Sequence, residues 1–156
     1  MNESILMTAS EFQQTGGHNV VINNLSKEIS DLGYSVTIGA FSFKEKPSEG
    51  IDHLKIKKNP LKKNEWQDKF NLIHNHETKL NYYSLYSKKP FIFHYHGVMG
   101  QIQKINLSIS LKLCQRHISK IISVSDSALS DISKNTKEKI PTLGIYNGVN
   151  NNFFNV

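Results

Sequence analysis

Residues 5–43, ILMTASEFQQTGGHNVVINNLSKEISDLGYSVTIGAFSF, carry the pattern that decides the fold. An apolar run over 5–7 and a second over 36–43 have the length of buried strands. Between them, residues 17–32 place apolar side chains three and four positions apart, and this spacing predicts a helix that Gly33 ends. A strand, a helix and a second strand in this order predict two parallel strands joined by a helical crossover.

The same alternation continues along the chain. Further runs of strand length lie at 51–56, 70–74, 91–95, 120–124 and 143–146, and helical stretches lie at 79–86, 101–119 and 125–132. The Lys-rich passage over 44–69 is expected to hold a long loop or an irregular crossover. Strands that are apolar nearly throughout are typical of a sheet covered on both faces. The sequence therefore predicts an α/β fold of the Rossmann-like, doubly wound type, with a mainly parallel sheet and helices on both faces.

Length and composition limit the function classes. The 156 residues fit one domain, and the single cysteine, Cys114, cannot form an internal disulfide. With no signal peptide at the start, a cytoplasmic location is expected, and no apolar run reaches the ~18 residues of a membrane-spanning helix. The 19 basic residues exceed the 13 acidic ones, but Arg116 is the only arginine, which argues against a nucleic-acid partner. A lysine-rich surface suits solubility, and it also suits attraction to anionic lipid or a phosphorylated substrate.

In doubly wound sheets, ligands bind beyond the carboxyl ends of the strands, so the residues that follow each apolar run are candidates. Gly16 and Gly17 open the first helix, where free backbone N–H groups and the helix dipole favour binding of an anionic group. The alternative to such a binding site is an ordinary glycine-rich turn. The chain has no GxGxxG motif there, so no nicotinamide cofactor is predicted.

Two histidine pairs follow later strands, His74 with His76 and His94 with His96. Alternate residues of a strand share one face, so each pair can be presented together. Four imidazoles raise the alternative of a metal hydrolase, but only Glu77 accompanies them as a further ligand, and no metal site is predicted. His96 precedes Gly97 at a strand end, where a proton acceptor or a hydrogen-bond partner for a hydroxyl is expected. A structural role is the alternative for each histidine.

Two signals lie near the end of the chain. Ser125 is in position to cap the last helix, which is its simplest interpretation. Asn147 and Gly148 form a turn signal, and the Asn-rich run after them is typical of a linker or a domain edge.

Taken together and in order, these blocks resemble a known family. The chain has GG at 16–17 with a helix that ends in LGYSVTI, then FNLIHNH, FIFHYHG, KIISVSDS and IYNGVNNNFF. This series, from residue 5 to residue 154, resembles the first domain of glycosyltransferase family 4, the group 1 transferases of GT-B fold. Three positions depart from the family pattern: Tyr34 replaces a histidine, and Asn71 and Asn150 each replace an aspartate.

The resemblance implies an activity and a set of site residues. It implies transfer of a sugar from a nucleotide diphosphate sugar to an acceptor hydroxyl on a glycan or a lipid, with retention of anomeric configuration and without a required metal or other cofactor. His96 matches the catalytic histidine of the family, with an acid/base or hydrogen-bonding role. The donor phosphate or the acceptor would contact the remaining matched residues, which are Gly16, Gly17, His76, Gly97 and Ser125.

The resemblance also implies a domain organisation. Residues 1–146 match the acceptor-side domain, and 147–156 match the start of the interdomain linker, with Asn147 and Gly148 as its hinge. The C-terminal donor-binding domain of the family is absent from these residues, so the fragment alone is expected to be inactive. A non-catalytic subunit that gives an acceptor site or a membrane dock to a separate donor domain is the alternative. The lysines over 55–63 and along 104–120 suit peripheral contact with the anionic inner face of the cell membrane.

Overall fold

The computed structural model describes residues 3–60, 62–97, 100–136 and 140–148. Within these residues the chain forms one seven-stranded sheet in the order β3-β2-β1-β4-β5-β6-β7, and every pair of neighbouring strands is parallel. The strands are β1 Ser4–Phe12, β2 Ser35–Phe43, β3 Asp52–Lys55, β4 Leu72–Asn75, β5 Phe91–Tyr95, β6 Lys120–Ser123 and β7 Thr142–Gly144. All seven predicted strand regions are confirmed, and so is the Rossmann-like, doubly wound fold class.

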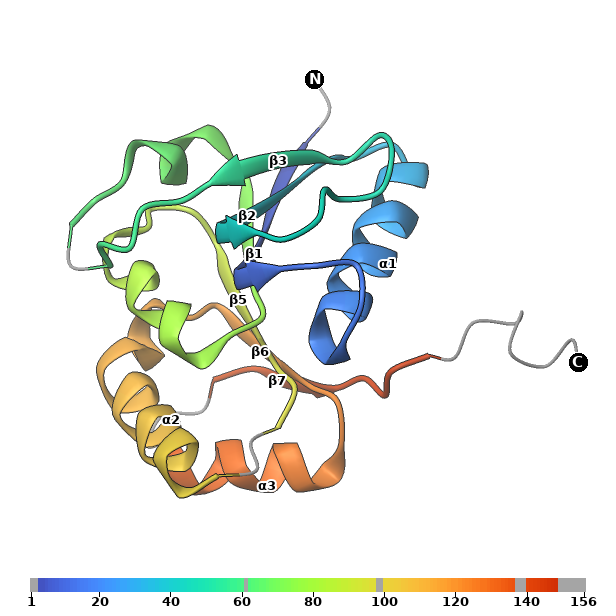
Figure 1. Ribbon diagram of the computed structural model, residues 1–156. Coiled ribbons are helices and arrows are strands. Elements are labelled where there is room, and N and C mark those ends of the chain that lie inside the picture. Colours follow the sequence, from blue (N-terminus) through green and yellow to red (C-terminus); the bar gives the residue numbers. More distant parts are fainter. Residues whose placement is uncertain (1–2, 61, 98–99, 137–139, 149–156) are drawn as a thin grey trace, which may run out of the picture.

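Helices cover both faces of the sheet (Figure 1). The α-helices are α1 Gly17–Asp31, α2 Gln101–Cys114 and α3 Asp126–Asn135, and the 3-10 helices are η1 Glu65–Lys69, η2 Thr78–Tyr86 and η3 Gln115–His117. Helix α1 packs on one face, while α2, α3 and η2 pack on the other (Figure 1). None of the helices among the described residues has the length and apolar character needed to cross a membrane.

Each face of the sheet has its own apolar core. On the α1 face, Met7 and Ile38 are fully buried against Ile22 of α1. On the opposite face, the buried strand residues pack against Leu107 of α2 and Ala128 of α3. This division follows from the period of two in each strand, because successive side chains point to opposite faces.

Two elements differ from the sequence-based expectation. The predicted helix over 101–119 ends at Cys114 and continues only as the short turn η3. The Lys-rich passage over 44–69 holds the helix η1, in which Trp66 is buried against Tyr83 at a ring-centroid distance of 5.4 Å. Gln67 secures this helix, since its Nε2 donates to the Tyr83 carbonyl over 2.7 Å. A lone aromatic in a polar passage gives no periodic signal, so the pattern did not indicate the helix.

The sheet order places a topological switch point between β1 and β4. From β1 the chain moves outward through β2 to β3, and it then returns to the other side of β1 to form β4. Crossovers diverge in opposite directions at this point, which leaves a crevice beyond the carboxyl ends of the two central strands. The fold therefore predicts a ligand site next to the ends of β1 and β4.

Candidate functional site

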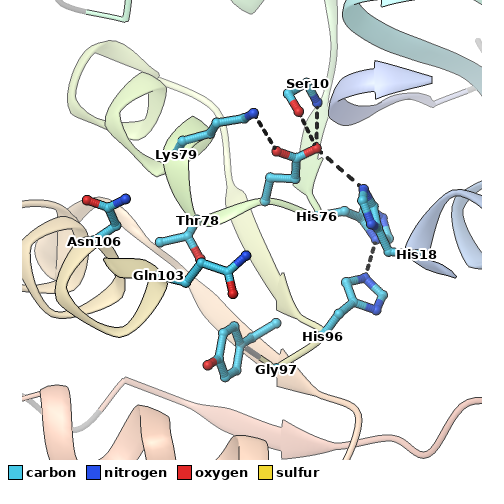
Figure 2. Close-up of a pocket in the computed structure, with 11 residues that line it drawn as sticks. Ser10, His18, His76, Thr78, Lys79, His96, Gly97, Gln103 and Asn106 are labelled. Atoms are coloured by element: carbon cyan, nitrogen blue, oxygen red, sulfur yellow. Dashed lines mark hydrogen bonds and ion pairs between the residues drawn. The ribbon is translucent and has the colours of Figure 1, made fainter. Parts of the chain in front are cut away.

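A cavity of about 450 Å³ lies at this crevice. Its walls come from the carboxyl ends of β1, β4 and β5 and from the N-terminal parts of α1, η2 and α2 (Figure 2). The lining residues are Ser10, His18, His76, Glu77, Thr78, Lys79, Tyr95, His96, Gly97, Gln103 and Asn106. Polar and titratable side chains thus gather at the one place where the topology opens the sheet.

Four histidines form a stacked row on the α1 face of the sheet. They are His74, His76, His94 and His96. The rings of His74 and His94 lie 5.3 Å apart and are inclined by 6°, and those of His94 and His96 lie 4.5 Å apart and are inclined by 18°. His76 Nδ1 and His96 Nε2 are 3.0 Å apart, which is hydrogen-bonding distance (Figure 2). The row leads from the buried interior to the cavity wall.

The histidine row is held in the neutral form. Burial, followed by repulsion from His96, lowers the pKa of His74 to about 4. Burial and then His74 lower the pKa of His94 to about 4 as well, and burial is the largest of the causes that hold the pKa of His76 well below its usual value. Burial and the neighbouring His94 and His18 lower the pKa of His96 to about 3, against a smaller opposing effect of Glu77. All four imidazoles are therefore uncharged at neutral pH.

Glu77 is the anionic centre of the cavity. Its carboxylate accepts hydrogen bonds from the Ser10 backbone N–H over 2.8 Å and from Ser10 Oγ over 2.6 Å, and Oε1 lies 3.4 Å from His18 Nε2 (Figure 2). Lys79 Nζ lies 3.4 Å from the other carboxylate oxygen. Burial alone would raise the pKa of Glu77, but the hydrogen bonds from His18 and Ser10 and the charge of Lys79 lower it to about 2. Glu77 is therefore ionised and fixed between β1, α1 and η2.

A buried amide network positions Glu77. Asn75 Oδ1 accepts from Thr8 Oγ1 over 3.0 Å and from the Glu77 backbone N–H over 3.1 Å. Asn75 Nδ2 donates to the Glu77 carbonyl over 2.8 Å and to Asn81 Oδ1 over 2.7 Å. With all four of its hydrogen bonds made inside the protein, this one amide joins β1, β4 and η2 at the switch point.

The N-terminus of α1 faces the same cavity through His18. Gly16 and Gly17 have φ angles of 89° and 41°, in the left-handed region that favours glycine. No side chain caps the helix at Gly16, so the backbone N–H groups of its first turn have no side-chain partner. The His18 ring, one residue further, lies 5.8 Å from the His96 ring. The glycine turn and His96 thus lie at the same edge of the sheet.

The structure distributes the predicted site residues as follows. His76, His96 and Gly97 line the cavity, and Gly16 and Gly17 adjoin it through His18. Ser125 caps helix α3, as its simplest interpretation predicted, because its Oγ accepts a hydrogen bond from the Ala128 backbone N–H over 3.1 Å. Asn147 and Gly148 are exposed in the segment after β7. The rest of the predicted linker, 149–156, lies outside the described residues, and the binding and hinge roles stay predictions.

The arrangement of the imidazoles bears on the metal alternative. Among the described residues, His74, His76 and His94 form a group whose ring nitrogens lie within 4.8 Å of one another. Ring nitrogens this close together have the spacing of a possible metal site, so the metal alternative stays a hypothesis. The same rings also stack, with those of His74 and His94 inclined by 6°.

Sequence reasoning missed several residues of the site. His18, Ser10 and Asn75 were not singled out, although His18 directly follows the glycine pair and Asn75 lies between two candidate histidines. Proximity to a predicted site residue was the available signal for both. Nothing in the local pattern distinguishes Ser10, which meets Glu77 only because β1 lies beside β4.

The fold and the cavity define a Rossmann-like domain with a polar cavity at the switch point of a parallel sheet. Residues 15–153 match the model of Glycosyltransferase Family 4, and the chain belongs to this family.

Solved structures of glycosyltransferases share the fold. The chain superimposes on HepE from Anabaena in complex with UDP and glucose, with a TM-score of 0.74 and 17% identity, over 98% of this chain and 46% of that one. It is similar to sucrose-phosphate synthase from Thermosynechococcus elongatus, with a TM-score of 0.70 and 12% identity, over 99% of this chain and 53% of that one. A glycosyltransferase from Rickettsia africae ESF-5 gives a TM-score of 0.63 and 17% identity, over 98% and 45% of the two chains. The chain thus spans about half the length of these proteins, and no curated protein sequence matches it.

Proposed function

We propose that the chain forms the acceptor-side wall of the catalytic cleft of a glycosyltransferase. In this proposal the enzyme transfers a sugar from a nucleoside diphosphate sugar to an acceptor hydroxyl, with retention of anomeric configuration. The single observation that carries the proposal is the cavity at the switch point, which brings His96 beside the uncapped N-terminus of α1 in a chain of glycosyltransferase family 4. A second domain, in the same chain or a separate one, completes the cleft and holds the nucleotide.

The N-terminus of α1 suits the leaving group. As the bond between the sugar and the diphosphate breaks, its electron pair stays on the phosphate oxygen and negative charge develops there. The uncapped N–H groups at Gly17 and His18, together with the helix dipole, stabilise such charge. Only a backbone without side chains at 16 and 17 adopts this turn readily and admits a close approach of the phosphate.

His96 suits the sugar or the acceptor hydroxyl. With a pKa lowered to about 3, its imidazole is neutral and serves as a hydrogen-bond partner rather than as a cationic acid at neutral pH. The contact with His76 engages Nε2 and leaves Nδ1 as the ring nitrogen available to a substrate. If His76 Nδ1–H is the donor in this contact, His96 carries its proton on Nδ1 and donates to a sugar oxygen. His76 is thereby proposed as a positioning residue.

The first donor to test is a UDP-sugar, because the HepE structure contains UDP and glucose. The proposed transfer needs no metal ion, since the helix N-terminus takes over the stabilisation of the diphosphate, and a chelator is expected to leave the rate unchanged. Sequencing the gene beyond the codon for Val156 decides whether the second domain follows in the same chain, with Asn147 and Gly148 as the hinge. A separate gene for that domain would favour the subunit alternative.

The decisive experiment replaces His96 in the complete enzyme. His96→Ala is expected to lower kcat for transfer about 100-fold or more, because a positioned hydrogen-bonding or proton-transfer group contributes about that much. His117→Ala is the matched control, since His117 is exposed at the end of η3 and does not line the cavity. Transfer at the wild-type rate by His96→Ala, for an identified donor and acceptor, would refute the assigned role.

A further inference from the structure

Three buried histidines of the row bring their ring nitrogens close together. We name His74, His76 and His94 the inner cluster; one nitrogen of each lies within 4.8 Å of the others. The three residues are only 6, 3 and 5% exposed. His74 lies in β4 and His76 directly follows it, while His94 belongs to the neighbouring strand β5, and all three rings lie on the same face of the sheet. Two paired strands therefore hold the three imidazoles in place.

Most ring nitrogens of the inner cluster have no hydrogen-bond partner. Within the part of the chain that the structure describes, this holds for Nε2 of His74, for Nε2 of His76 and for both ring nitrogens of His94. All four atoms are shielded from solvent. A buried polar atom without a partner costs free energy, and native proteins contain few of them. The cluster thus has the properties of a site that binds an ion or water.

The chemistry of the cluster selects the class of ion. Imidazole nitrogen is a ligand for zinc and its neighbours in the first transition row, whereas Mg²⁺ and Ca²⁺ take oxygen ligands. The imidazoles of the cluster are uncharged at neutral pH, which is the form that binds a metal. Three histidines with one water are a ligand set that zinc uses in proteins. The cluster supplies the three histidines.

A small rearrangement brings the ligand atoms to coordinating distance. Zinc lies about 2.0–2.1 Å from each histidine nitrogen, so two ligand nitrogens of a tetrahedral site lie about 3.4 Å apart. The nitrogens of the inner cluster, which lie within 4.8 Å of one another, reach this spacing by small ring rotations, because χ2 of histidine is broad. His76 lines the cavity at the switch point, which gives an ion and a water a path to the cluster.

We propose that the inner cluster binds one divalent transition-metal ion of the zinc class. Nε2 of His74, Nε2 of His76 and one ring nitrogen of His94 are the protein ligands, and a water from the cavity is the fourth ligand. The ion uses Nε2 of His76, whereas Nδ1 of His76 lies 3.0 Å from His96 Nε2, so the two contacts are compatible (Figure 2). His96 is then the outer partner that orients His76 toward the ion.

The ion has a structural role in this proposal and takes no part in sugar transfer. It is held at the interior end of the histidine row, whereas the diphosphate is proposed to lie at the N-terminus of α1. A metal-free enzyme therefore keeps the groups proposed for transfer. The metal site does not rest on the proposed function, and its experiments measure no transfer reaction, so failure of either proposal leaves the other standing.

The first experiment measures zinc binding by the protein without an affinity tag. Metal-free protein, prepared with a chelator, is the reference state for every stability measurement on the row. It is titrated with Zn²⁺ in competition with a chromogenic chelator. We expect one ion per chain with a Kd of about 1 µM or lower, competition by Co²⁺, and no competition by an excess of Mg²⁺ or Ca²⁺. Absence of stoichiometric zinc binding would overturn the proposal and leave water as the partner of the buried nitrogens.

Single substitutions locate the ion. His74→Gln and His94→Gln each remove one ligand and are expected to weaken zinc binding at least about 100-fold. His117→Gln, at an exposed position, is the matched control and should bind zinc like the wild type. His96→Gln removes only the outer partner of His76 and should weaken binding about tenfold. A loss with His96→Gln as large as with His74→Gln would place the ion in the cavity and overturn the proposal.

Two measurements use wild-type protein and stay decisive if a variant fails to fold. The X-ray absorption spectrum of the zinc-loaded protein is expected to show nitrogen ligands at about 2.0–2.1 Å with the outer scattering of three imidazoles. Co²⁺ is expected to give the intense visible absorption of a four-coordinate ion rather than the weak absorption of a six-coordinate ion. Fewer than two imidazoles, or six-coordinate cobalt, would assign the ion to surface groups and overturn the proposal.

The ion should also stabilise the folded state. Zinc above its Kd is expected to raise the urea midpoint of the wild type by an amount that grows with zinc concentration. It should leave the midpoint of His94→Gln unchanged, and Mg²⁺ should affect neither protein. Equal zinc-induced shifts in the wild type and in His94→Gln would show that zinc acts outside the inner cluster.

Discussion

The neutral histidine row makes a quantitative prediction about acid stability. In the unfolded chain an imidazole titrates near 6.5, whereas burial lowers the pKa of His74 and His94 in the folded protein to about 4. Above pH 6.5 both states are neutral and the histidines do not affect the free energy of unfolding. As the pH falls below 6.5, the unfolded state binds protons that the folded state does not bind. The free energy of unfolding therefore decreases progressively until the pH reaches the pKa values of the folded protein.

The expected magnitude is large for a domain of this size. At pH 5, a histidine with a folded pKa of about 4 costs about 2 kcal/mol of unfolding free energy relative to pH 7.5. His74 and His94 together account for about 4 kcal/mol, which is a major part of the 5–15 kcal/mol typical of a native protein. Glu77 does not contribute in this interval, because its pKa is lowered to about 2 and its stabilisation is lost only below about pH 4.5.

The assay is urea denaturation at pH 7.5 and at pH 5, followed by circular dichroism. Wild-type protein is expected to lose at least about 4 kcal/mol between the two conditions, while His74→Gln and His94→Gln should each lose about 2 kcal/mol less than the wild type does. Comparing each protein with itself removes the packing cost of the substitution. His117→Gln, at an exposed position, serves as the control. An acid-induced loss that is the same in all four proteins would refute the assignment of the neutral state to the row.

Three further predictions concern the switch point. Gly17→Ala is expected to lower the free energy of unfolding by about 1–2 kcal/mol, measured by urea denaturation. The space around residue 17 is open, but a φ of 41° strains any residue that has a side chain. The same variant of the complete enzyme should bind a nucleoside diphosphate more weakly, measured by calorimetry. Asn75→Ala is expected to lower the free energy of unfolding by about 3 kcal/mol, since it leaves the buried Thr8 and Asn81 without their partner; an unchanged denaturation midpoint would contradict the network. His76→Leu is expected to lower kcat about tenfold with little change in KM for the donor, because one hydrogen bond that orients His96 is lost; a change in KM alone would show that His76 binds the substrate instead.

The sequence predicted the sheet well because its strands are short apolar runs bounded by polar residues. Each strand region is confirmed, and so is the helix that begins after the first strand at Gly17. The contacts of Glu77 were not predictable in the same way. Ser10 and Glu77 are 67 residues apart and meet because β4 pairs with β1, and no local pattern specifies which strands become neighbours.

The periodicity of α2 illustrates a second limit. Leu107 and Leu111 are four residues apart, and so are Ile105 and Ile109. The periodicity alone therefore does not show which of the two pairs is buried. Packing against η2 and the sheet buries the first pair and exposes the second. Only the three-dimensional structure shows which apolar residues of this helix the core leaves exposed.

The uneven distribution of acidic residues has a consequence at distances beyond direct contact. The stretch from Thr78 to Ser125, which forms η2 and α2, has seven basic residues and no acid, whereas α3 on the same face carries Asp126 and Asp131. Positive charge on this face is therefore concentrated at η2 and α2. An approaching anion is attracted to these two elements within roughly 10 Å, the screening length at 0.1 M ionic strength.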